Sequence, residues 1–184
     1  TVLKYDVRNP EWPERDRFIL SKGHGVLGFY AALEAAGYFS EERLNTFQQD
    51  GGDFPSHPVM NLALGIETSN GSLGHGLSLG IGSLLAARRK RMDYEVYVLL
   101  GNGECNEGSV WEAAMSAAHF RLDRLTAIVD HNRMQSDGAS ADVLDMGTMA
   151  LKWKAFGWNV AEVDGHNIEQ LHAALTSRER NGKP

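Results

Sequence analysis

Two largely apolar runs, at 94–100 and 125–130, stand out in the hydrophobic pattern of the chain. Runs of this length predict strands that are buried on both faces, as in a parallel sheet covered by helices. The segment between them opens on a glycine-flanked turn and continues from near Glu107 as a helix. Because a strand, a helix and a second strand connected in this way run parallel in one sheet, the pattern predicts an α/β fold.

Further segments alternate in the same way and predict a layered parallel sheet with helices on both faces. Ser40 has the character of a helix N-cap, and Gly37 that of a helix stop. The helix expected at 73–91 carries glycine and alanine on one face, which would let it approach another helix closely. The other expected elements are helices at 26–36, 40–48, 146–156 and 168–180, and a third strand at 158–163.

Composition and charge narrow the possible functions. With 184 residues, 42% of them apolar, and no repeat or linker, the chain suits a single domain over 1–184. Its net charge of -6 argues against a nucleic-acid surface. No apolar run is long enough to cross a membrane and no signal peptide is visible, so we expect a cytoplasmic protein. The single cysteine, Cys105, excludes an internal disulfide; a helix start beside it could lower the thiol pKa, although a bystander role is favoured.

Two asparagines, Asn102 and Asn132, follow the two apolar runs. Since the carboxyl ends of parallel strands lie at one edge of the sheet, both should face one crevice, where ligands bind in open α/β sheets. The turn between Gly101 and Gly108 can bring backbone N–H groups close to an anion, and the helix that follows adds its positive dipole end. Amide and backbone oxygens suit Mg²⁺, whose coordination phosphate oxygens and water complete. These residues therefore predict a metal–diphosphate site.

Four stretches of the chain resemble those of transketolases, in the same order. The segment GNGECNEGSVWEAAMSAAHFRLDRLTAIVDHN resembles the thiamine-diphosphate motif. The stretches SKGHG at 21–25, FPSHP at 54–58 and NGSLGHGLSLGIG at 70–82 resemble the loops with which transketolases hold the cofactor and reach the sugar. The similarity runs essentially end to end and is closest to the split transketolases, whose diphosphate-binding half is a separate amino-terminal subunit. It implies the thiamine-diphosphate-binding fold.

The resemblance also implies a role for each matching position. Mg²⁺ or another divalent cation would be bound by the side-chain oxygens of Asn102 and Asn132 and by the backbone carbonyl of Met134. The residues that would contact thiamine diphosphate are His24, Gly71, Leu73, Gly103 and Asn132. The catalytic residues that would face the reacting carbon of the sugar are His24 and His57, and Glu107 would lie at the subunit interface.

The implied activity is the transfer of a two-carbon ketol unit from a ketose to an aldose, with sugar phosphates as expected substrates, as in pentose phosphate carbohydrate metabolism. A carboxy-terminal transketolase subunit would supply the pyrimidine-binding domain, and the expected assembly is a dimer of heterodimers. Relative to the family pattern, the chain starts late and stops before a further strand, so we expect it to be incomplete at both ends.

Two positions depart from the family pattern. Asn102 stands where the family has aspartate, and His75 where its GPLGQG-type loop has glutamine. An amide keeps an oxygen ligand but removes a negative charge, so the metal should be held more weakly. Two alternatives therefore stay open: a catalytically impaired assembly or regulatory subunit of the same fold, and a different thiamine-diphosphate enzyme, such as a 2-oxo-acid dehydrogenase alpha subunit or a deoxyxylulose-phosphate synthase.

Other polar residues have structural interpretations. Beside His166, Asn167 and Gln170 have the spacing of a helix capping box. Glu104 and Glu112 could be drawn as an acid–base pair, but carboxylates in the first turn of a helix need only the dipole to explain them.

Overall fold

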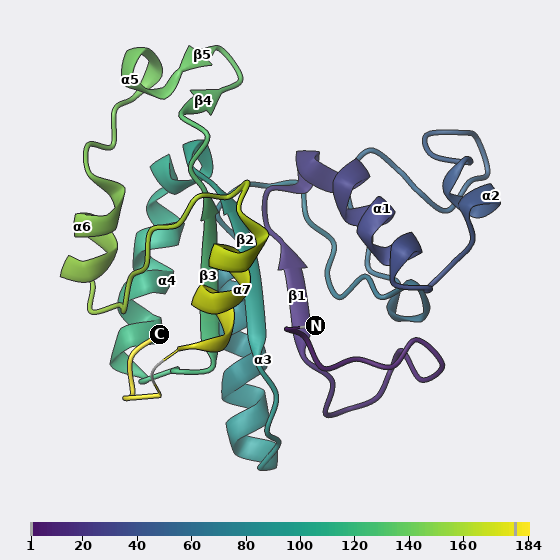
Figure 1. The fold of residues 1–184 in the computed structure, drawn as a ribbon, viewed down its shortest axis with the longest axis horizontal. Coiled ribbons are helices and arrows are strands. Elements are labelled where there is room, and N and C mark those ends of the chain that lie inside the picture. The colour runs from purple at the N-terminus through teal and green to yellow at the C-terminus, as the bar shows by residue number, and fades with distance from the viewer. Residues whose placement is uncertain (1, 179) are drawn as a thin grey trace.

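A three-stranded parallel sheet lies at the centre of the fold (Figure 1). This computed structural model describes residues 2–178 and 180–184. The strands are β1 (Arg17–Leu20), β2 (Val96–Gly101) and β3 (Leu125–Asp130), with β2 in the middle. Gly101 pairs with Asp130, so the carboxyl ends of β2 and β3 lie side by side. The parallel pairing predicted for the two apolar runs is confirmed.

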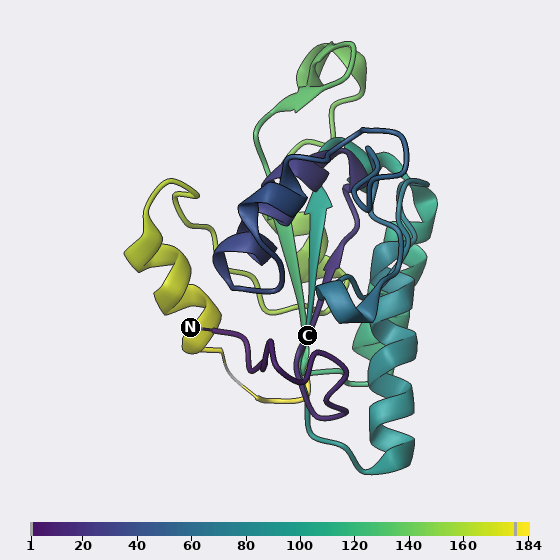
Figure 2. The ribbon, with the colours of Figure 1, turned by 90° about the vertical axis from the view of Figure 1, so that its right-hand side faces the viewer.

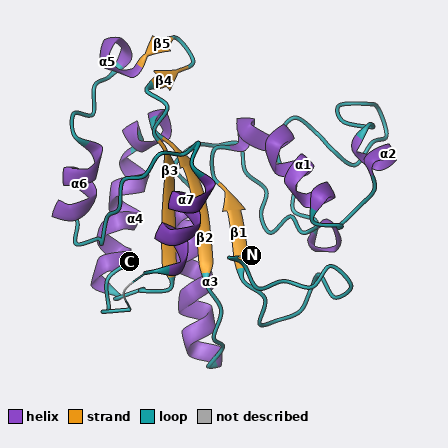
Figure 3. Ribbon diagram, viewed as in Figure 1, coloured by secondary structure: helices purple, strands orange, loops and turns teal. Residues whose placement is uncertain are grey.

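Helices cover both faces of this sheet, as predicted (Figures 2 and 3). α3 (Gly76–Lys90) and α4 (Gly108–His119) lie on one face, and α7 (Ile168–Thr176) lies over the other. The other helices are α1 (Val26–Ala35), α2 (Glu41–Leu44), α5 (Ser140–Val143) and α6 (Met149–Ala155), with 3₁₀ turns η1 (Gly23–Gly25), η2 (Leu62–Leu64) and η3 (Gly103–Asn106). β4 (Met134–Gln135) and β5 (Gly138–Ala139) form an antiparallel hairpin. Across the described residues, no helix is both long enough and apolar enough to cross a bilayer.

The main core forms where α3 packs on β2. The side chains of Val96, Val98 and Leu100 are 0% exposed. A Cβ added at Gly80 in α3 would lie 2.9 Å from Val98 Cγ2, so this glycine lets the helix backbone approach the sheet. At Gly80 the close approach is therefore to the sheet, and α3 also contacts another helix, α4.

A second apolar cluster, beside β1, positions the loop that carries His57. Tyr30 in α1 packs against Phe54 with 4.9 Å between ring centroids. The Tyr30 hydroxyl donates to the Pro55 carbonyl over 3.3 Å, and burial raises its pKa to about 12. The loop after Phe54 is thus fixed by a buried aromatic contact, although His57 itself is exposed.

The third strand of the sheet differs from the prediction. Segment 158–163 forms no strand within the described chain. Trp158 and Val160 pack on the core instead, with Trp158 Nε1 donating to the Ala114 carbonyl over 3.0 Å, whereas Val163 is exposed. The Asn159 N–H donates to the Pro184 carbonyl over 2.8 Å, outside any strand ladder. The third strand is β1, which the sequence pattern did not predict because Arg17 and the charged residues before it interrupt the apolar run.

Several helix ends also differ from the prediction, for local backbone reasons. α3 begins at Gly76, after Gly74, whose φ of 82° is not helical. α6 begins at Met149, after Gly147, whose φ is 58°. α2 ends at residue 44 and α7 at residue 176, before the predicted 48 and 180.

Half of the predicted capping box forms at the start of α7. The Asn167 side chain accepts the Gln170 N–H over 3.0 Å, as expected. Gln170 Oε1, however, accepts the N–H of Asp164 at 3.1 Å rather than that of Asn167. The Asn167 N–H bonds to the Asp164 carbonyl instead.

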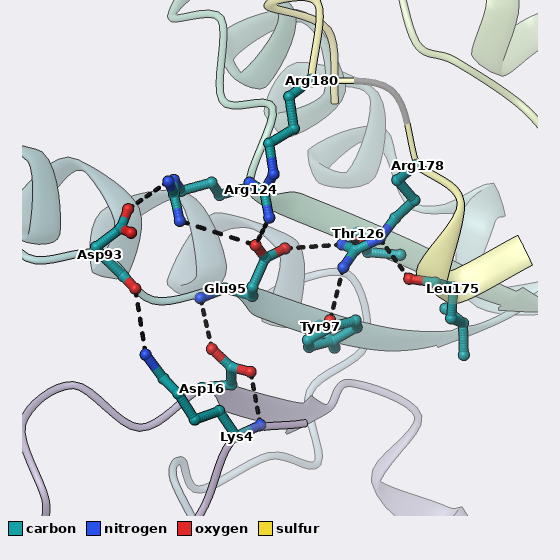
Figure 4. Close-up of polar contacts among 10 residues, drawn as sticks. All are labelled: Lys4, Asp16, Asp93, Glu95, Tyr97, Arg124, Thr126, Leu175, Arg178 and Arg180. Atoms are coloured by element: carbon teal, nitrogen blue, oxygen red, sulfur yellow. Dashed lines mark hydrogen bonds and ion pairs between the residues drawn. The ribbon is translucent and has the colours of Figure 1, made fainter. Parts of the chain in front are cut away.

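Charged side chains hold the segment after α7 at the amino end of the strands (Figure 4). Arg178 lies 2.9 Å from a Glu95 carboxylate oxygen and donates to the Tyr97 hydroxyl over 2.7 Å. Arg180 pairs with the same carboxylate. The Asp16 carboxylate accepts the Glu95 N–H over 2.9 Å. Polar contacts at the amino ends of the strands therefore stabilise the fold. The predicted ligand site is at the opposite edge of the sheet, where the strands have their carboxyl ends.

Candidate functional site

A cleft of about 480 Å³ opens at the carboxyl ends of β2 and β3. Its volume falls in the range typical of small-molecule sites, roughly 300 to 1,000 Å³. The predicted site residues on its wall are His24, Leu73, Asn102, Gly103, Asn132 and Met134. Lys22, Glu104, Glu107 and Gln135 also line it. The predicted amides thus share one cavity, whereas Gly71 and His57 lie outside its lining.

Asn102 is placed by the end of β2. Its backbone N–H donates to the Asp130 carbonyl over 3.1 Å, which joins it to the end of β3. The side chain is 4% exposed, and its Nδ2 donates to Ser140 Oγ over 2.6 Å. This contact orients the amide, and no donor in the described part of the chain engages Oδ1. Asn102 therefore has one oxygen available to a ligand.

Asn132 also lines the cleft and is exposed, two residues after the end of β3. Its Nδ2 donates to Asp130 Oδ2 over 3.2 Å, and its Oδ1 accepts the Met134 N–H over 2.9 Å. The second contact leaves the carbonyl oxygen with a further lone pair. Together with Asn102, it forms a pair of amide oxygens at adjacent strand ends.

Glu104 forms the floor of the cleft, a role that the sequence did not reveal. The side chain is 2% exposed, and its Oε1 accepts the Ser21 hydroxyl and, over 2.9 Å, the Gly74 N–H. Its Oε2 accepts the Gly101 N–H over 3.0 Å. One buried carboxylate thus joins three loops that are far apart in the sequence. The expectation that the helix dipole alone explains Glu104 is wrong, because three specific donors surround it.

Lys22 is the one lysine or arginine among the lining residues, and sequence analysis passed over it. Its Nζ lies 2.6 Å from Asp130 Oδ2, and the two side chains are 14% and 39% exposed. Its place inside the SKGHG stretch was the available signal. The pair gives the cleft a cation that an incoming anion can reach.

The two histidines predicted to be catalytic are related through Gly23, which precedes His24 in the chain and lies against the His57 ring. His24 is exposed and lines the cleft. The His57 ring packs over two glycines: an added Cβ would lie 3.0 Å from His57 Cδ2 at Gly23 and 3.5 Å from it at Gly71. Gly23 thus leaves room for the His57 ring, and both histidines are exposed.

Of two other residues singled out in the sequence, Glu107 lines the cleft and His75 does not. Glu107 lines it, is exposed and lies immediately before α4. His75 lies immediately before α3 and is exposed, but is not one of the lining residues.

The donor set fits a hard cation with a diphosphate. The described residues contain no group of three or more histidine, cysteine, aspartate or glutamate side chains that could hold a metal. The oxygens at hand are amide and backbone oxygens, which suit Mg²⁺ when phosphate completes its shell. Two buried atoms on the cleft wall, Asn106 Oδ1 and Gln135 Nε2, lack hydrogen-bond partners in the described structure, and the Gln135 nitrogen could donate to a phosphate oxygen. At Gly103 an added Cβ would lie 2.9 Å from Gln135 Cγ, so glycine keeps the turn open.

Cys105 lies in the same turn but is 0% exposed. Burial, with a smaller contribution from the Glu104 charge, raises its thiol pKa from 9.0 to about 12. A lowered pKa was the wrong expectation, because desolvation outweighs the effect of the nearby helix start. The buried, protonated thiol agrees with the favoured bystander role.

Comparison with known proteins gives one family for the whole chain. The family model described as "Transketolase, thiamine diphosphate binding domain" matches residues 1–184. The chain is 44% identical over 184 residues to a 6-deoxy-6-sulfo-D-fructose transketolase subunit of Clostridium sp. (strain MSTE9), covering 100% of this chain and 67% of that protein. It is 43% identical over 183 residues to an apulose-4-phosphate transketolase subunit of Actinobacillus succinogenes, covering 100% of this chain and 66% of that protein. The chain thus spans about two thirds of the length of these relatives.

Solved structures of transketolases are similar to this chain in fold as well as in sequence. The transketolase of Campylobacter jejuni superposes with a TM-score of 0.92 at 31% identity, covering 99% of this chain and 30% of that one. The transketolase of Leishmania mexicana gives 0.89 at 35% identity, covering 99% and 29%. These similarities confirm the resemblance and the thiamine-diphosphate-binding fold expected from the sequence.

Proposed function

Because the chain belongs to the family of the thiamine-diphosphate-binding domain of transketolases, we propose that it is the amino-terminal subunit of a two-subunit transketolase. In this proposal it binds the diphosphate of thiamine diphosphate through Mg²⁺ or a similar cation. The observation that carries the proposal is the meeting of Asn102 and Asn132 on one cleft at the ends of adjacent parallel strands. A carboxy-terminal subunit supplies the pyrimidine-binding domain, and the expected assembly is a dimer of heterodimers. The names of the two relatives, each a transketolase subunit, support this partner.

The cation is held by oxygen atoms alone. Asn102 and Asn132 offer their Oδ1 atoms, and Met134 offers its backbone carbonyl. Ser140 and Asp130 accept from the two Nδ2 groups, which turns each amide so that oxygen is the atom left for a metal. Partners of this kind behind the ligands fix ligand orientation in metal sites generally.

His24 and His57 act on the sugar. Bound thiamine diphosphate supplies the carbon nucleophile for ketol transfer. The two exposed imidazoles accept and return protons at the hydroxyl and carbonyl oxygens of the sugar, and donate hydrogen bonds where negative charge develops on oxygen. Gly23, the neighbour of His24, has no side chain and so leaves room for the His57 ring.

The donor substrate is a ketose that carries an anionic group, and the acceptor is an aldose. The relatives are named for 6-deoxy-6-sulfo-D-fructose and apulose 4-phosphate, and a sulfo group and a phosphate are both anionic. These names support an anionic ketose, with a sugar phosphate as the first candidate.

The test is an activity assay on the full-length subunit purified with its partner subunit. Xylulose 5-phosphate and ribose 5-phosphate should give a longer ketose phosphate only when thiamine diphosphate and Mg²⁺ are both present. Samples lacking either component, and a sample treated with a chelator, serve as controls. Absence of turnover with these sugars, with 6-deoxy-6-sulfo-D-fructose and with apulose 4-phosphate would count against the proposed transketolase activity.

One observation favours a second candidate, an assembly or regulatory subunit of the same fold that has lost catalysis. Asn102 leaves the metal ligands without the carboxylate that the family has there. A cofactor titration separates the two candidates, because ligand at a hundred times its dissociation constant stabilises a fold by about 2.7 kcal/mol. An unchanged melting temperature with Mg²⁺ and thiamine diphosphate favours the assembly subunit. Release of CO₂ from a 2-oxo acid would instead indicate a different thiamine-diphosphate enzyme.

A further inference from the structure

The Lys22–Asp130 pair has a contact pattern that the proposed function does not yet use. Lys22 lines the cleft, and its Nζ lies 2.6 Å from Oδ2 of Asp130, which is just behind the lining residues Asn102 and Asn132 that it contacts. The lysine stem runs past two glycines: a Cβ added at Gly25 would lie 3.3 Å from its Cε, and one added at Gly101 would lie 3.8 Å from its Cβ. The ammonium group reaches the carboxyl end of β3, where Asp130 is the last residue.

Asp130 contacts both residues proposed as metal ligands, Asn132 through its side chain and Asn102 through its backbone. The same Oδ2 that faces Lys22 also accepts from Asn132 Nδ2 over 3.2 Å. The Asp130 carbonyl accepts the Asn102 N–H over 3.1 Å. The Asp130 carboxylate thus contacts the Asn132 amide directly, and the Asp130 backbone holds the backbone of Asn102 at the adjacent strand end.

The charges on the wall do not match a magnesium diphosphate in the observed arrangement. Lys22 and Asp130 neutralise one another, and Asn102 is neutral. A diphosphate ester with one Mg²⁺ keeps net negative charge, and the cation lacks the carboxylate that an aspartate at 102 would provide. Moving Lys22 Nζ from Asp130 to a phosphate oxygen corrects both mismatches, because a cation then meets the anion and the Asp130 carboxylate is left beside the metal ligand Asn132.

We propose that Lys22 is a diphosphate-binding residue that exchanges Asp130 for a phosphate oxygen, and that Asp130 is a positioning residue whose released carboxylate offsets the charge missing at Asn102. This inference rests on the proposed function. Charge-assisted hydrogen bonds are among the stronger contacts available to a phosphate, worth roughly 1.5 to 3 kcal/mol. Loss of the Lys22 contact therefore corresponds to about a 10- to 100-fold loss of affinity.

The experiment measures cofactor binding by the full-length subunit in complex with its partner, by calorimetry with thiamine diphosphate and Mg²⁺. Lys22→Met should raise the dissociation constant of thiamine diphosphate about 10- to 100-fold and make it less sensitive to salt, whereas Lys22→Arg should retain most of the affinity. Asp130→Asn, at saturating cofactor, should raise the Mg²⁺ concentration needed for half-saturation by about tenfold or more. The control is Arg43→Met, which breaks an exposed ion pair with Asp53 far from the cleft and should change neither constant.

The double variant Lys22→Met/Asp130→Asn separates phosphate binding from a merely structural ion pair. If the pair only stabilises the fold, removing both charges restores the wild-type affinity, and the inference is overturned. If Lys22 binds phosphate, the double variant keeps the raised dissociation constant for thiamine diphosphate. Wild-type protein that binds no cofactor would defeat the proposed function itself, whereas wild-type binding with unchanged constants in Lys22→Met and Asp130→Asn would defeat this inference alone.

Discussion

Replacement of Glu104 by glutamine should destabilise the fold although the two side chains have nearly the same shape. The buried carboxylate accepts from the Ser21 hydroxyl and from the N–H groups of Gly74 and Gly101. Glutamine offers one oxygen, which can keep two of these donors, and its amide nitrogen then faces the N–H of Gly101. That donor loses its partner in a site from which water is excluded.

The size of the effect follows from these contacts. An orphaned buried donor costs about 1–3 kcal/mol, and two charge-assisted hydrogen bonds that become neutral ones lose up to about 1 kcal/mol more in total. The expected loss in free energy of unfolding is therefore about 1–4 kcal/mol. With a urea dependence of roughly 2 kcal/mol per molar, the midpoint should fall by about 0.5–2 M.

The assay is urea unfolding followed by tryptophan fluorescence, with Glu112→Gln as the matched control. Glu112 lies on α4 with an exposed side chain, so the same chemical change there should alter the free energy by less than about 0.5 kcal/mol. Equal unfolding curves for the two variants would refute the conclusion that Glu104 accepts three donors as a carboxylate.

Three further predictions concern packing, pH and the metal. Gly80→Ala should lower the free energy of unfolding by about 1–3 kcal/mol, because the added Cβ would lie 2.9 Å from Val98. Gly82→Ala has no atom within 4 Å of the added Cβ and should raise that free energy by about 0.5–1 kcal/mol. A higher melting temperature for Gly80→Ala than for Gly82→Ala would contradict the packing of α3. The Cys105 pKa is raised from 9.0 to about 12, so folding favours the protonated thiol and stability should fall between pH 9 and 12 by up to about 1.4 kcal/mol per pH unit. Urea midpoints at several pH values test this, and Cys105→Ala should lack that part of the slope. Asn102→Asp should tighten Mg²⁺ binding in the presence of thiamine diphosphate by about tenfold or more, since a carboxylate is the stronger ligand; a calorimetric titration with unchanged affinity would argue against a metal at this position.

The sequence predicted those features that depend on local pattern. Strands β2 and β3 are apolar runs because both of their faces are buried, and parallel pairing then brings the ends of the two runs together. The relation of Asn102 to Asn132 follows from that pairing alone. The covering helices were found for the same reason, through their apolar spacing.

Features that depend on distant contacts were missed. β1 has four residues, begins with Arg17 and is completed by pairing with β2, so it has little pattern of its own. Conversely, segment 158–163 is apolar because Trp158 fills the core, and apolar character alone does not distinguish packing from strand pairing. The Lys22–Asp130 and Ser21–Glu104 contacts join residues 108 and 83 positions apart, and a single sequence carries no signal for such pairs.

The Glu104 carboxylate has a consequence for the kinetics of ligand capture. Since it fastens three loops to one another within the fold, the disorder of those loops is lost once, when the polypeptide folds, and not again at each encounter with a ligand. The part of the cleft that Glu104 lines is then preshaped, so ligand capture should need no rearrangement of these three loops.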